Sequence, residues 1–397
     1  MSKILFIPSW FPAFGSRGGE YFINLFELYQ SNFPGSRMLY INLRSNQFSG
    51  IRYIRFFARF RLIKVVLIKL QLRYLKADDL KNDRVLIEIP TIFNHSEKDD
   101  YYLHLSLAYQ YFYRKEFLDF KLISAQSVEY AGLVSFHLQK KFGDLSYTIT
   151  EHNYFSSGRF SIDLWPGVRA AFKGASHVYF CSHDKMRQVL ATGVEIDLKK
   201  RHVNYNYVKT TEYLISNYEP LNVLRIITVA SASHFKDLPT LFATLDKLLK
   251  MKVDYKFTLV GFGTWGNSEK YLSENFICEN QHRFNLIPHL DHTDLILEYQ
   301  KNDLFLLTSL AEGMPVSLLE AMELGLMAVV TKHGGSEEVV LDGVNGYSAN
   351  VSDSKQLSEF IRNIYQGNMK HIPELNKRRA HSFCSADAYE LRTFLKL

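Results

Sequence analysis

Short apolar segments alternate with segments of helical periodicity along almost the whole chain. The apolar, strand-like segments are KILFIPS (3–9), RMLYINL (37–43), RVLIEI (84–89), FKLIS (120–124), SYTIT (146–150), HVYFCS (177–182), VLRIITVA (223–230), YKFTLVG (255–261), RFNLIP (283–288), DLFLLTS (303–309) and LMAVVT (326–331). Periods near 3.6 lie between them, as in 238–250 and 293–301. Continuous apolar strands separated by helices predict α/β architecture with parallel sheets that are covered on both faces.

The strand–helix rhythm stops at a polar segment, KTTEYLISNYEPLN (209–222), and then restarts. We therefore expect two doubly wound, Rossmann-like domains at 1–210 and 211–380, with a C-terminal helix at 381–397 that packs back on the first domain. In such sheets ligands bind outside the carboxyl ends of the strands. The loops after the strands, at a cleft between the domains, are the expected site.

Composition narrows the class of protein. The chain has 397 residues, of which 47% are hydrophobic and 22% charged, as in globular proteins with more than one core. The net charge of +6 comes without a nucleic-acid-binding motif, so no nucleic-acid partner is expected. Cys181, Cys278 and Cys384 have no paired spacing, which indicates free thiols in a reducing compartment and no zinc site.

Membrane-spanning and secretory segments are not predicted. The N-terminal MSKILFIPSWF has too short an apolar run before Pro8 for a signal peptide and is typical of a buried strand. No apolar run approaches the length of a transmembrane helix. The expected location is cytoplasmic. The segment 51–76 suggests, in addition, peripheral contact with the inner face of the cytoplasmic membrane.

The segment 51–76, IRYIRFFARFRLIKVVLIKLQLRYLK, holds eight Lys or Arg residues and no acidic residue. On a helical wheel, Arg52, Arg55 and Arg59 share one sector, and most of the aromatic residues lie elsewhere. A basic, aromatic-rich amphipathic helix binds anionic membrane surfaces. The alternative is a surface helix on the sheet with a solvated basic face, and the sequence leaves both open.

The strongest chemical signal begins where strand 303–309 ends, in the loop LAEGMP. Pro315 suits the first position of a helix, and Gly325 suits the residue after its end. This leaves the backbone N–H groups of Gly313, Met314 and 316–318 unpaired at the helix start, including that of Val316. A helix N-terminus of this kind is a natural anion site.

Two carboxylates flank that anion site. Glu312 stands just before the helix, and Glu320 lies about 7–8 Å further along its axis. A carboxylate beside a bound phosphate is repulsive unless it accepts hydrogen bonds from neutral hydroxyls. Acceptors on both sides of an anion site therefore predict a receptor for a sugar, a diphosphate and a ribose.

The sequence EGMPVSLLEAMELG, followed by VVTKHGGSEEVV and DGVNGYSA, resembles the carboxyl-domain signature of family-4 glycosyltransferases, which are retaining enzymes of GT-B fold. The resemblance implies that Glu312 holds hydroxyls of the transferred sugar and that Glu320 holds the ribose hydroxyls. Gly334, Gly335 and Glu338 match the family's Gly-Gly-x-x-Glu loop. The resemblance also implies that domain 1–210 binds the acceptor and that domain 211–380 binds the nucleotide sugar.

The resemblance extends to loops that contact the diphosphate and the sugar. In IITVASASHFKDLPTLFATL (226–245), Lys236 matches a diphosphate-binding lysine, whereas Ser231 replaces the family's arginine. In PSWFPAFGSRGGEYF (8–22), Gly18 and Gly19 let the backbone approach the acceptor or a phosphate. A turn without a ligand is the other interpretation of these glycines.

Two histidine positions complete the implied site. His152, in TITEHNYFSSG (148–158), matches a histidine that contacts the donor sugar. His289 and Leu290, in RFNLIPHLD, fall where the family's backbone meets the nucleotide base, although Pro288 replaces a usual glycine. For each histidine a structural role is the alternative.

The segment GFGTWG (261–266) spells the G-x-G-x-x-G pattern of dinucleotide-binding proteins. It is followed by a polar, irregular stretch, and no strand with a terminal acidic residue follows at the required distance. A dinucleotide site is therefore not expected here, and the resemblance to glycosyltransferases implies that the segment is the loop after the second strand of the second domain.

The resemblance implies transfer of a hexosyl unit, with retention, from a nucleotide diphosphate sugar to a saccharide or lipid-linked saccharide of a surface glycan. UDP is the favoured nucleotide. No Asp-x-Asp motif is present, so neither a metal ion nor another cofactor is expected. Two alternatives stay open: a nucleotide-sugar epimerase of the same fold, and a non-catalytic protein that binds sugar nucleotides.

Overall fold

The structure is a computed structural model that describes residues 3–9, 20–45, 61–74, 82–91, 98–152, 155–209, 223–231, 233–261, 280–368 and 372–393. The chain divides into two compact units. Unit 1 comprises Met1–Phe180 and Arg187–His202, and unit 2 comprises Cys181–Met186 and Val203–Leu397. Each unit is built around one sheet, and each is described by itself.

Unit 1 contains a sheet that, within the described residues, has the strand order β3-β2-β1-β4-β5-β6-β7. The strands are β1 (Ile4–Ile7), β2 (Arg37–Ser45), β3 (Arg84–Thr91), β4 (Leu122–Gln126), β5 (Ser146–Glu151), β6 (His177–Phe180) and β7 (Arg201–Val203). The pairings from β3 across to β6 are parallel. All four residues of β1 are buried, as expected for a central strand covered on both faces.

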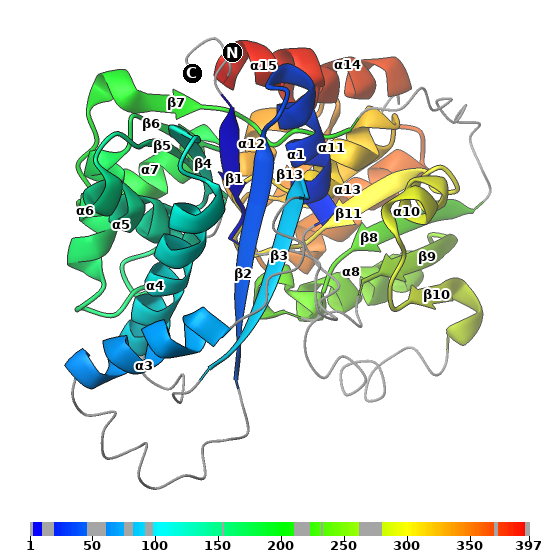
Figure 1. The fold of residues 1–397 in the computed structure, drawn as a ribbon. Helices are drawn as coiled ribbons and strands as arrows, with labels where there is room; N and C mark the ends of the chain where they lie inside the picture. The colour runs from blue at the N-terminus through cyan, green and yellow to red at the C-terminus, as the bar shows by residue number, and fades with distance from the viewer. Residues whose placement is uncertain are drawn as a thin grey trace, which may run out of the picture. The chain divides into compact units, whose positions relative to one another are not determined.

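Helices connect the strands of unit 1. They are α1 (Glu20–Asn32), α3 (Arg61–Tyr74), α4 (Lys98–Glu116), α5 (Leu133–Phe142) and α6 (Trp165–Gly174). Helix α7 (His183–Ala191) begins in unit 2 and ends in the segment Arg187–His202 of unit 1. Helix α3 packs on α4, α4 on α5 and α5 on α6, so that these helices form a continuous layer (Figure 1). A short π-turn, Val128–Gly132, joins β4 to α5.

Unit 2 contains a second parallel sheet with the order β10-β9-β8-β11-β12-β13 among its described strands. The strands are β8 (Leu224–Val229), β9 (Tyr255–Val260), β10 (Phe284–Ile287), β11 (Leu304–Leu307), β12 (Met327–Thr331) and β13 (Gly346–Ala349). The helices are α8 (Leu238–Lys250), α10 (His292–Tyr299), α11 (Val316–Glu323), α12 (Gly335–Val339), α13 (Ser354–Tyr365), α14 (Pro373–Cys384) and α15 (Ala386–Thr393).

The period-2 alternation of the strands divides the core of unit 2 into two layers. Leu304 and Leu306 of β11 belong to a cluster with apolar residues of α8 and α13. Phe305 and Leu307 face the opposite way, into a cluster with residues of α10, α11 and α14. Both faces of the sheet are therefore covered, as the continuous apolar runs predict.

The parallel sheets, the strands and the helices at 238–250 and 293–301 are confirmed, with bounds that differ by a few residues. One detail of the predicted helix start is wrong. Pro315 precedes α11 as its N-cap, because its ψ of 115° is extended, and Val316 is the first helical residue. Gly325 has a φ of +87° directly after the helix, as its predicted terminating role requires.

Several predictions concern residues outside the described ranges. They include Gly18, Gly19, Arg52, Arg55, Arg59 and Cys278, as well as most of the segment 261–266. The described part of the basic segment is helix α3. None of the helices in the described ranges combines the length and apolarity that would let it cross a membrane.

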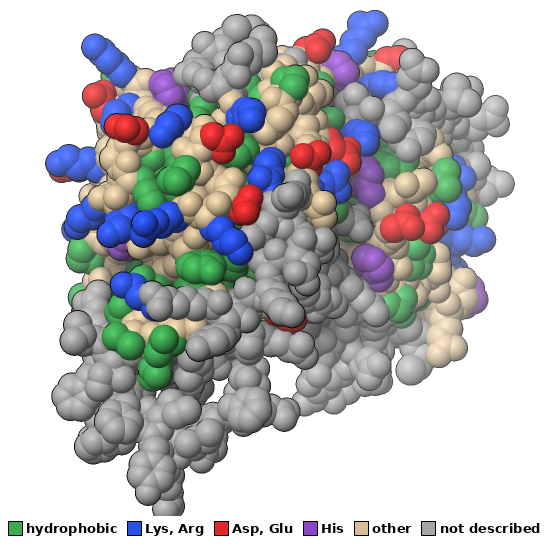
Figure 2. Space-filling model, viewed as in Figure 1, with side chains coloured by type: hydrophobic (Ala, Val, Ile, Leu, Met, Phe, Trp, Pro, Cys, Tyr) green, Lys and Arg blue, Asp and Glu red, His purple; other side chains and the backbone are tan. Residues whose placement is uncertain are grey.

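The surface of unit 1 is rich in basic side chains. The last turns of α4 and α5 carry the exposed residues Arg114, Lys115, Lys140 and Lys141, which suit the negative end of a helix dipole. Figure 2 shows Lys and Arg side chains gathered on the visible face of this unit. On α3, Val66 and Leu70 are 52% and 44% exposed.

Candidate functional site

The central polar cluster of unit 2 lies where the strand order reverses, between β8 and β11. Two loops leave the carboxyl ends of these adjacent strands, which is the position where ligands bind in open α/β sheets. The hydroxyl of Thr308 donates to the carbonyl of Lys236 (2.9 Å), and Leu310 N donates to Phe235 O (2.8 Å). These bonds fasten the loop after β8 to the loop after β11.

Lys236 and Glu312 meet across this junction. The Lys236 ammonium lies 2.5 Å from Oε1 of Glu312, and the Ser309 hydroxyl donates to the same oxygen (2.9 Å). The side chains are 22% and 19% exposed. Burial alone would raise the pKa of Glu312, but the nearby Lys236 and His333, together with the two hydrogen bonds, outweigh it and hold this pKa below its ordinary value. Glu312 is therefore an ionised acceptor.

The loop after β12 lies against the same segment. Glu312 forms an isolated parallel bridge with Gly334. A Cβ atom on Gly335 would lie 2.0 Å from the carbonyl oxygen of Gly313, and Gly334 has a φ of +85°. Both positions therefore require glycine, the first for close approach and the second for its backbone conformation as well as for contact with Asp184.

Side chains of Ser182 and Asn206 hold the backbone between Glu312 and α11 by hydrogen bonds. Ser182 Oγ donates to the Gly313 carbonyl (3.0 Å), and the Asn206 side chain donates to the Met314 carbonyl (2.8 Å). Among the described residues, no side chain caps the N-terminus of α11. The first-turn amides, from Val316 onward, are thus left to an incoming acceptor such as a phosphate.

Glu320, on α11, is 7% exposed and lies beside α10. Its Oε1 is 3.1 Å from His292 Nε2, and its Oε2 accepts from the Tyr299 hydroxyl (3.3 Å). A role for His292 or Tyr299 was not predicted from the sequence. Their seven-residue separation, which is two turns of helix, is a signal that could have placed both on one face of α10.

The other positions implied for unit 2 differ in their surroundings. His289 is exposed, and Leu290 packs against the core cluster that contains α11. Ser231 is half-buried after β8. The Glu338 carboxylate accepts from the backbone N–H groups of His183 (3.1 Å) and Asp184 (3.0 Å), and so it caps the start of α7.

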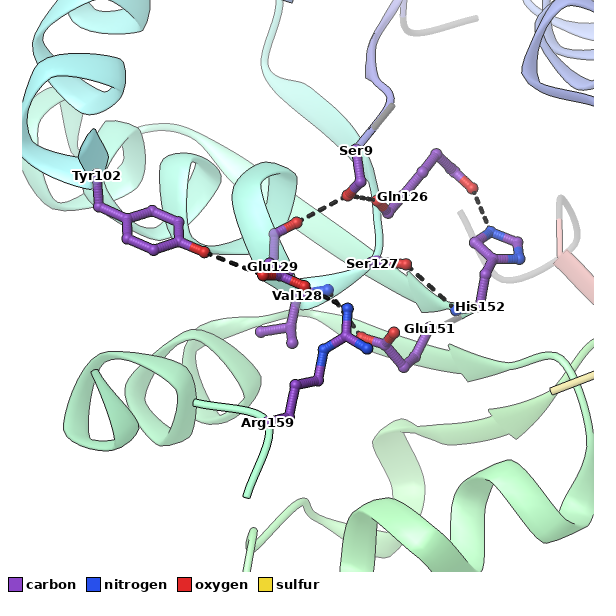
Figure 3. Close-up of polar contacts among 9 residues, drawn as sticks. All are labelled: Ser9, Tyr102, Gln126, Ser127, Val128, Glu129, Glu151, His152 and Arg159. Carbon is purple, nitrogen blue, oxygen red and sulfur yellow. Dashed lines mark hydrogen bonds and ion pairs between the residues drawn. The ribbon is translucent and has the colours of Figure 1, made fainter. Parts of the chain in front are cut away.

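In unit 1 the predicted residue His152 lies directly after β5. Its Nε2 is 2.9 Å from Oε1 of Gln126, and its N–H donates to Ser127 Oγ (3.3 Å). Figure 3 shows that Ser9, Gln126 and His152 meet where β1, β4 and β5 end. The strand order also reverses here, between β1 and β4, so that His152 stands at a ligand-binding edge of its own sheet.

A polar cluster next to His152 was not foreseen. Glu129 pairs with Arg159 and accepts from the Tyr102 hydroxyl (3.4 Å), as Figure 3 shows. The turn that presents Glu129 is strained, because Ser127 and Tyr130 have φ angles of 73° and 62°. Strain of this kind concentrates at functional sites, which makes the cluster a second candidate region. No spacing in the sequence marks it.

The structure thus brings together Lys236, Glu312 and the Gly313–Met314 backbone at the start of α11, with Glu320 further along the same helix. His152 lies in the other unit. The remaining predicted residues, Gly18, Gly19, Arg52, Arg55 and Arg59, lie outside the described ranges.

Comparison with known proteins supports this picture. Residues 212–380 match the family described as glycosyl transferases group 1. The amylovoran biosynthesis glycosyltransferase AmsK of Erwinia amylovora is 27% identical over 163 residues, which cover 40% of this chain and 40% of AmsK. The match therefore spans less than half of the curated relative.

Solved structures are similar over the whole chain. Anabaena HepE in complex with UDP and glucose has a TM-score of 0.70 at 18% identity and covers 100% of this chain and 99% of its own. Sucrose-phosphate synthase of Thermosynechococcus elongatus has a TM-score of 0.73 at 14% identity, covering 100% and 98%. The fold is GT-B, as predicted from the sequence, and its second half matches the glycosyl transferases group 1 family.

Proposed function

We propose that this protein is a retaining glycosyltransferase that moves a hexosyl unit from a nucleotide diphosphate sugar, with UDP as the favoured nucleotide. The acceptor is a saccharide or lipid-linked saccharide in surface glycan synthesis. The observation that carries the proposal is the Lys236–Glu312 pair at the strand-order reversal of unit 2. The names of AmsK and of the HepE complex with UDP and glucose are consistent with it.

Each group in the site has a distinct task. The diphosphate lies on the uncapped amides of α11 and on Lys236, so that negative charge is balanced without a metal ion. Glu312 accepts hydrogen bonds from hydroxyls of the transferred sugar. Glu320 takes the ribose hydroxyls, beside His292 and Tyr299.

In the transfer step, the bond between the anomeric carbon and the phosphate oxygen breaks while a bond to the acceptor oxygen forms on the same face of the sugar. The acceptor hydroxyl gives its proton to the departing diphosphate oxygen. Lys236 and the amides of α11 stabilise the charge that develops on the diphosphate. The Glu312 carboxylate stabilises the positive charge that develops on the sugar ring.

We also propose that helix α3 brings unit 1 to an anionic membrane where a lipid-linked acceptor resides. Ile68 and Leu72 are buried, whereas Val66 and Leu70 are exposed beside the exposed Lys69. The helix therefore presents apolar and basic side chains together to its surroundings, as interfacial helices do.

A thermal-shift panel of UDP-, GDP- and ADP-sugars, followed by a transfer assay with anomeric analysis, tests the proposal. We expect one nucleotide-sugar class to raise the unfolding midpoint and to support retained transfer. Release of an altered donor sugar without acceptor would favour the epimerase alternative. Binding without any turnover would favour the non-catalytic alternative.

A further inference from the structure

His333 is a buried polar side chain of unit 2 that the proposed reaction has not yet used. The residue is 6% exposed, and neither ring nitrogen has a hydrogen-bond partner in any other described residue. Buried polar groups are almost always hydrogen-bonded, and an unpaired one destabilises a fold. An aliphatic side chain of similar size would fill this space without that penalty.

The position of His333 is fixed by its neighbours in the chain. Thr331 Oγ1 donates to Ser309 O (2.6 Å), and Ser336 Oγ donates to Thr331 O (2.9 Å). The following residue, Gly334, is bridged to Glu312. The loop therefore holds the imidazole beside the proposed sugar site and does not leave it free to turn to solvent.

The charged groups that act on His333 are Glu312, Lys236 and Asp184. Burial is the largest influence and, together with Lys236, it outweighs the two carboxylates and an interaction of the ring with its own backbone, so that the pKa of His333 lies below its ordinary value. The ring is therefore neutral near pH 7. A neutral imidazole offers one donor and one acceptor, which is the complement of a hydroxyl group.

We propose that His333 is a sugar-specificity residue, whose ring nitrogens bind a hydroxyl of the transferred sugar next to the hydroxyls held by Glu312. This inference rests on the proposed function. As the donor binds, Lys236 turns from Glu312 to the diphosphate, and Glu312 is then available to accept from the sugar. The hydroxyl then satisfies the unpaired nitrogens, so that binding energy is specific to the sugar and does not depend on the nucleotide.

The test compares His333→Leu, His333→Asn and a control, His282→Leu, at an exposed position. Isothermal titration gives Kd for UDP and for UDP-glucose, UDP-galactose and UDP-N-acetylglucosamine, or for the GDP or ADP equivalents if the thermal-shift panel selects them. We expect His333→Leu to weaken nucleotide-sugar binding about tenfold or more and to leave the nucleoside diphosphate Kd within about twofold. His333→Asn, which keeps a donor and an acceptor, should retain part of the sugar affinity.

Two further readouts separate binding from a structural role. In the absence of ligand, His333→Leu should raise the unfolding midpoint, because it removes an unsatisfied buried group. Monodeoxy donor sugars should bind the wild type more weakly at one hydroxyl position, and this discrimination should vanish in His333→Leu. The His282→Leu control should change neither.

Unchanged sugar affinity in His333→Leu, an equal loss for sugar and nucleotide, or a lowered midpoint would overturn the inference and leave the proposed function standing. If the wild type binds no nucleotide sugar, the proposed function itself fails, and the inference fails with it.

Discussion

The Lys236 ammonium and the Glu312 carboxylate, 76 residues apart in the sequence, lie 2.5 Å apart where the two central loops of unit 2 meet. In the ligand-free protein each neutralises the other. A donor that carries hydroxyls and a diphosphate can replace both halves of this contact, because hydroxyls donate to the carboxylate and phosphate oxygens accept from the ammonium. The pair is therefore a preformed site for a ligand with both groups.

Glu312→Gln should lower transfer strongly without unfolding the protein. The amide keeps the size of the side chain but removes the charge that stabilises the sugar as it becomes positive. We expect kcat to fall about 10²–10³-fold. Steady-state kinetics with a thermal unfolding curve check this, and Glu337→Gln, at an exposed position of α12, is the matched control. Wild-type kcat in Glu312→Gln would refute the catalytic role.

Lys236→Met should alter the pH profile as well as the rate. Burial raises the pKa of Glu312, and the Lys236 ammonium lowers it. Without the ammonium, less of the effect of burial is cancelled, so the pKa of Glu312 rises. Because the reaction needs the carboxylate, the acidic limb of log kcat/KM should move to higher pH than in the wild type. The stability that Glu312 contributes, which the wild type loses only as pH falls through the lowered pKa, should also disappear at higher pH. Lys355→Met, at an exposed position, is the control; an unmoved limb would contradict the coupling.

Glu320→Gln should act on nucleotide affinity more than on the chemical step. Glu320 is remote from the transferred sugar in the proposed complex, so its loss weakens binding of the substrate and the transition state alike. We expect KM for the donor and Kd for the nucleotide to rise about tenfold, with kcat changed less. Titration with nucleoside diphosphate measures this. A large fall in kcat with an unchanged Kd would assign Glu320 another role.

Gly335→Ala should destabilise unit 2 because the new methyl group would overlap the Gly313 carbonyl. The loop that carries Glu312 would have to move, and we expect a loss of about 1–3 kcal/mol in unfolding free energy together with reduced transfer. Gly158→Ala is a useful comparison, since Gly158, like Gly335, has no positive φ, and no atom lies within 4 Å of its Cβ position. Equal stability losses and unaffected transfer in both variants would show that close packing at Gly335 is unimportant.

Val66→Glu and Leu70→Glu should weaken membrane binding through α3. Each substitution replaces an exposed apolar side chain near Lys69 with a carboxylate, and anionic lipids repel that carboxylate. Co-sedimentation with phosphatidylcholine vesicles, with and without phosphatidylserine, measures the effect. Wild-type protein should bind only the anionic vesicles, and the variants should bind them several-fold less. Leu118→Glu, exposed beyond the end of α4, is the control.

Much of the fold could be predicted because buried parallel strands such as 304–307 are continuously apolar and because Gly325 marks the end of α11. The importance of Lys236 and Glu312 was predictable from the family motif. Their direct contact was not, because it requires that β8 and β11 be neighbours in the sheet, and the sequence does not give the strand order. The extended backbone of Pro315 follows two carbonyls, those of Gly313 and Met314, that accept from the distant residues Ser182 and Asn206, and the sequence does not show these contacts.

Other features had no local signal. His333 has no distinguishing feature within the motif VVTKHGGSEEVV. Its proposed role was inferred from its burial and from the lack of hydrogen-bond partners for its two ring nitrogens in other described residues. His292 and Tyr299 contact Glu320 through packing of α10 on α11, which requires the three-dimensional arrangement. The Glu129 cluster depends on backbone strain in the π-turn after β4, which composition does not reveal.

The central proposal is that the start of α11 and Lys236 bind the donor diphosphate while Glu312 binds the sugar. A crystal structure with the donor selected by thermal shift tests this most directly. We predict the diphosphate on the first-turn amides of α11 and on Lys236, with sugar hydroxyls on Glu312. A diphosphate bound elsewhere, with the Lys236–Glu312 contact intact, would contradict the proposal.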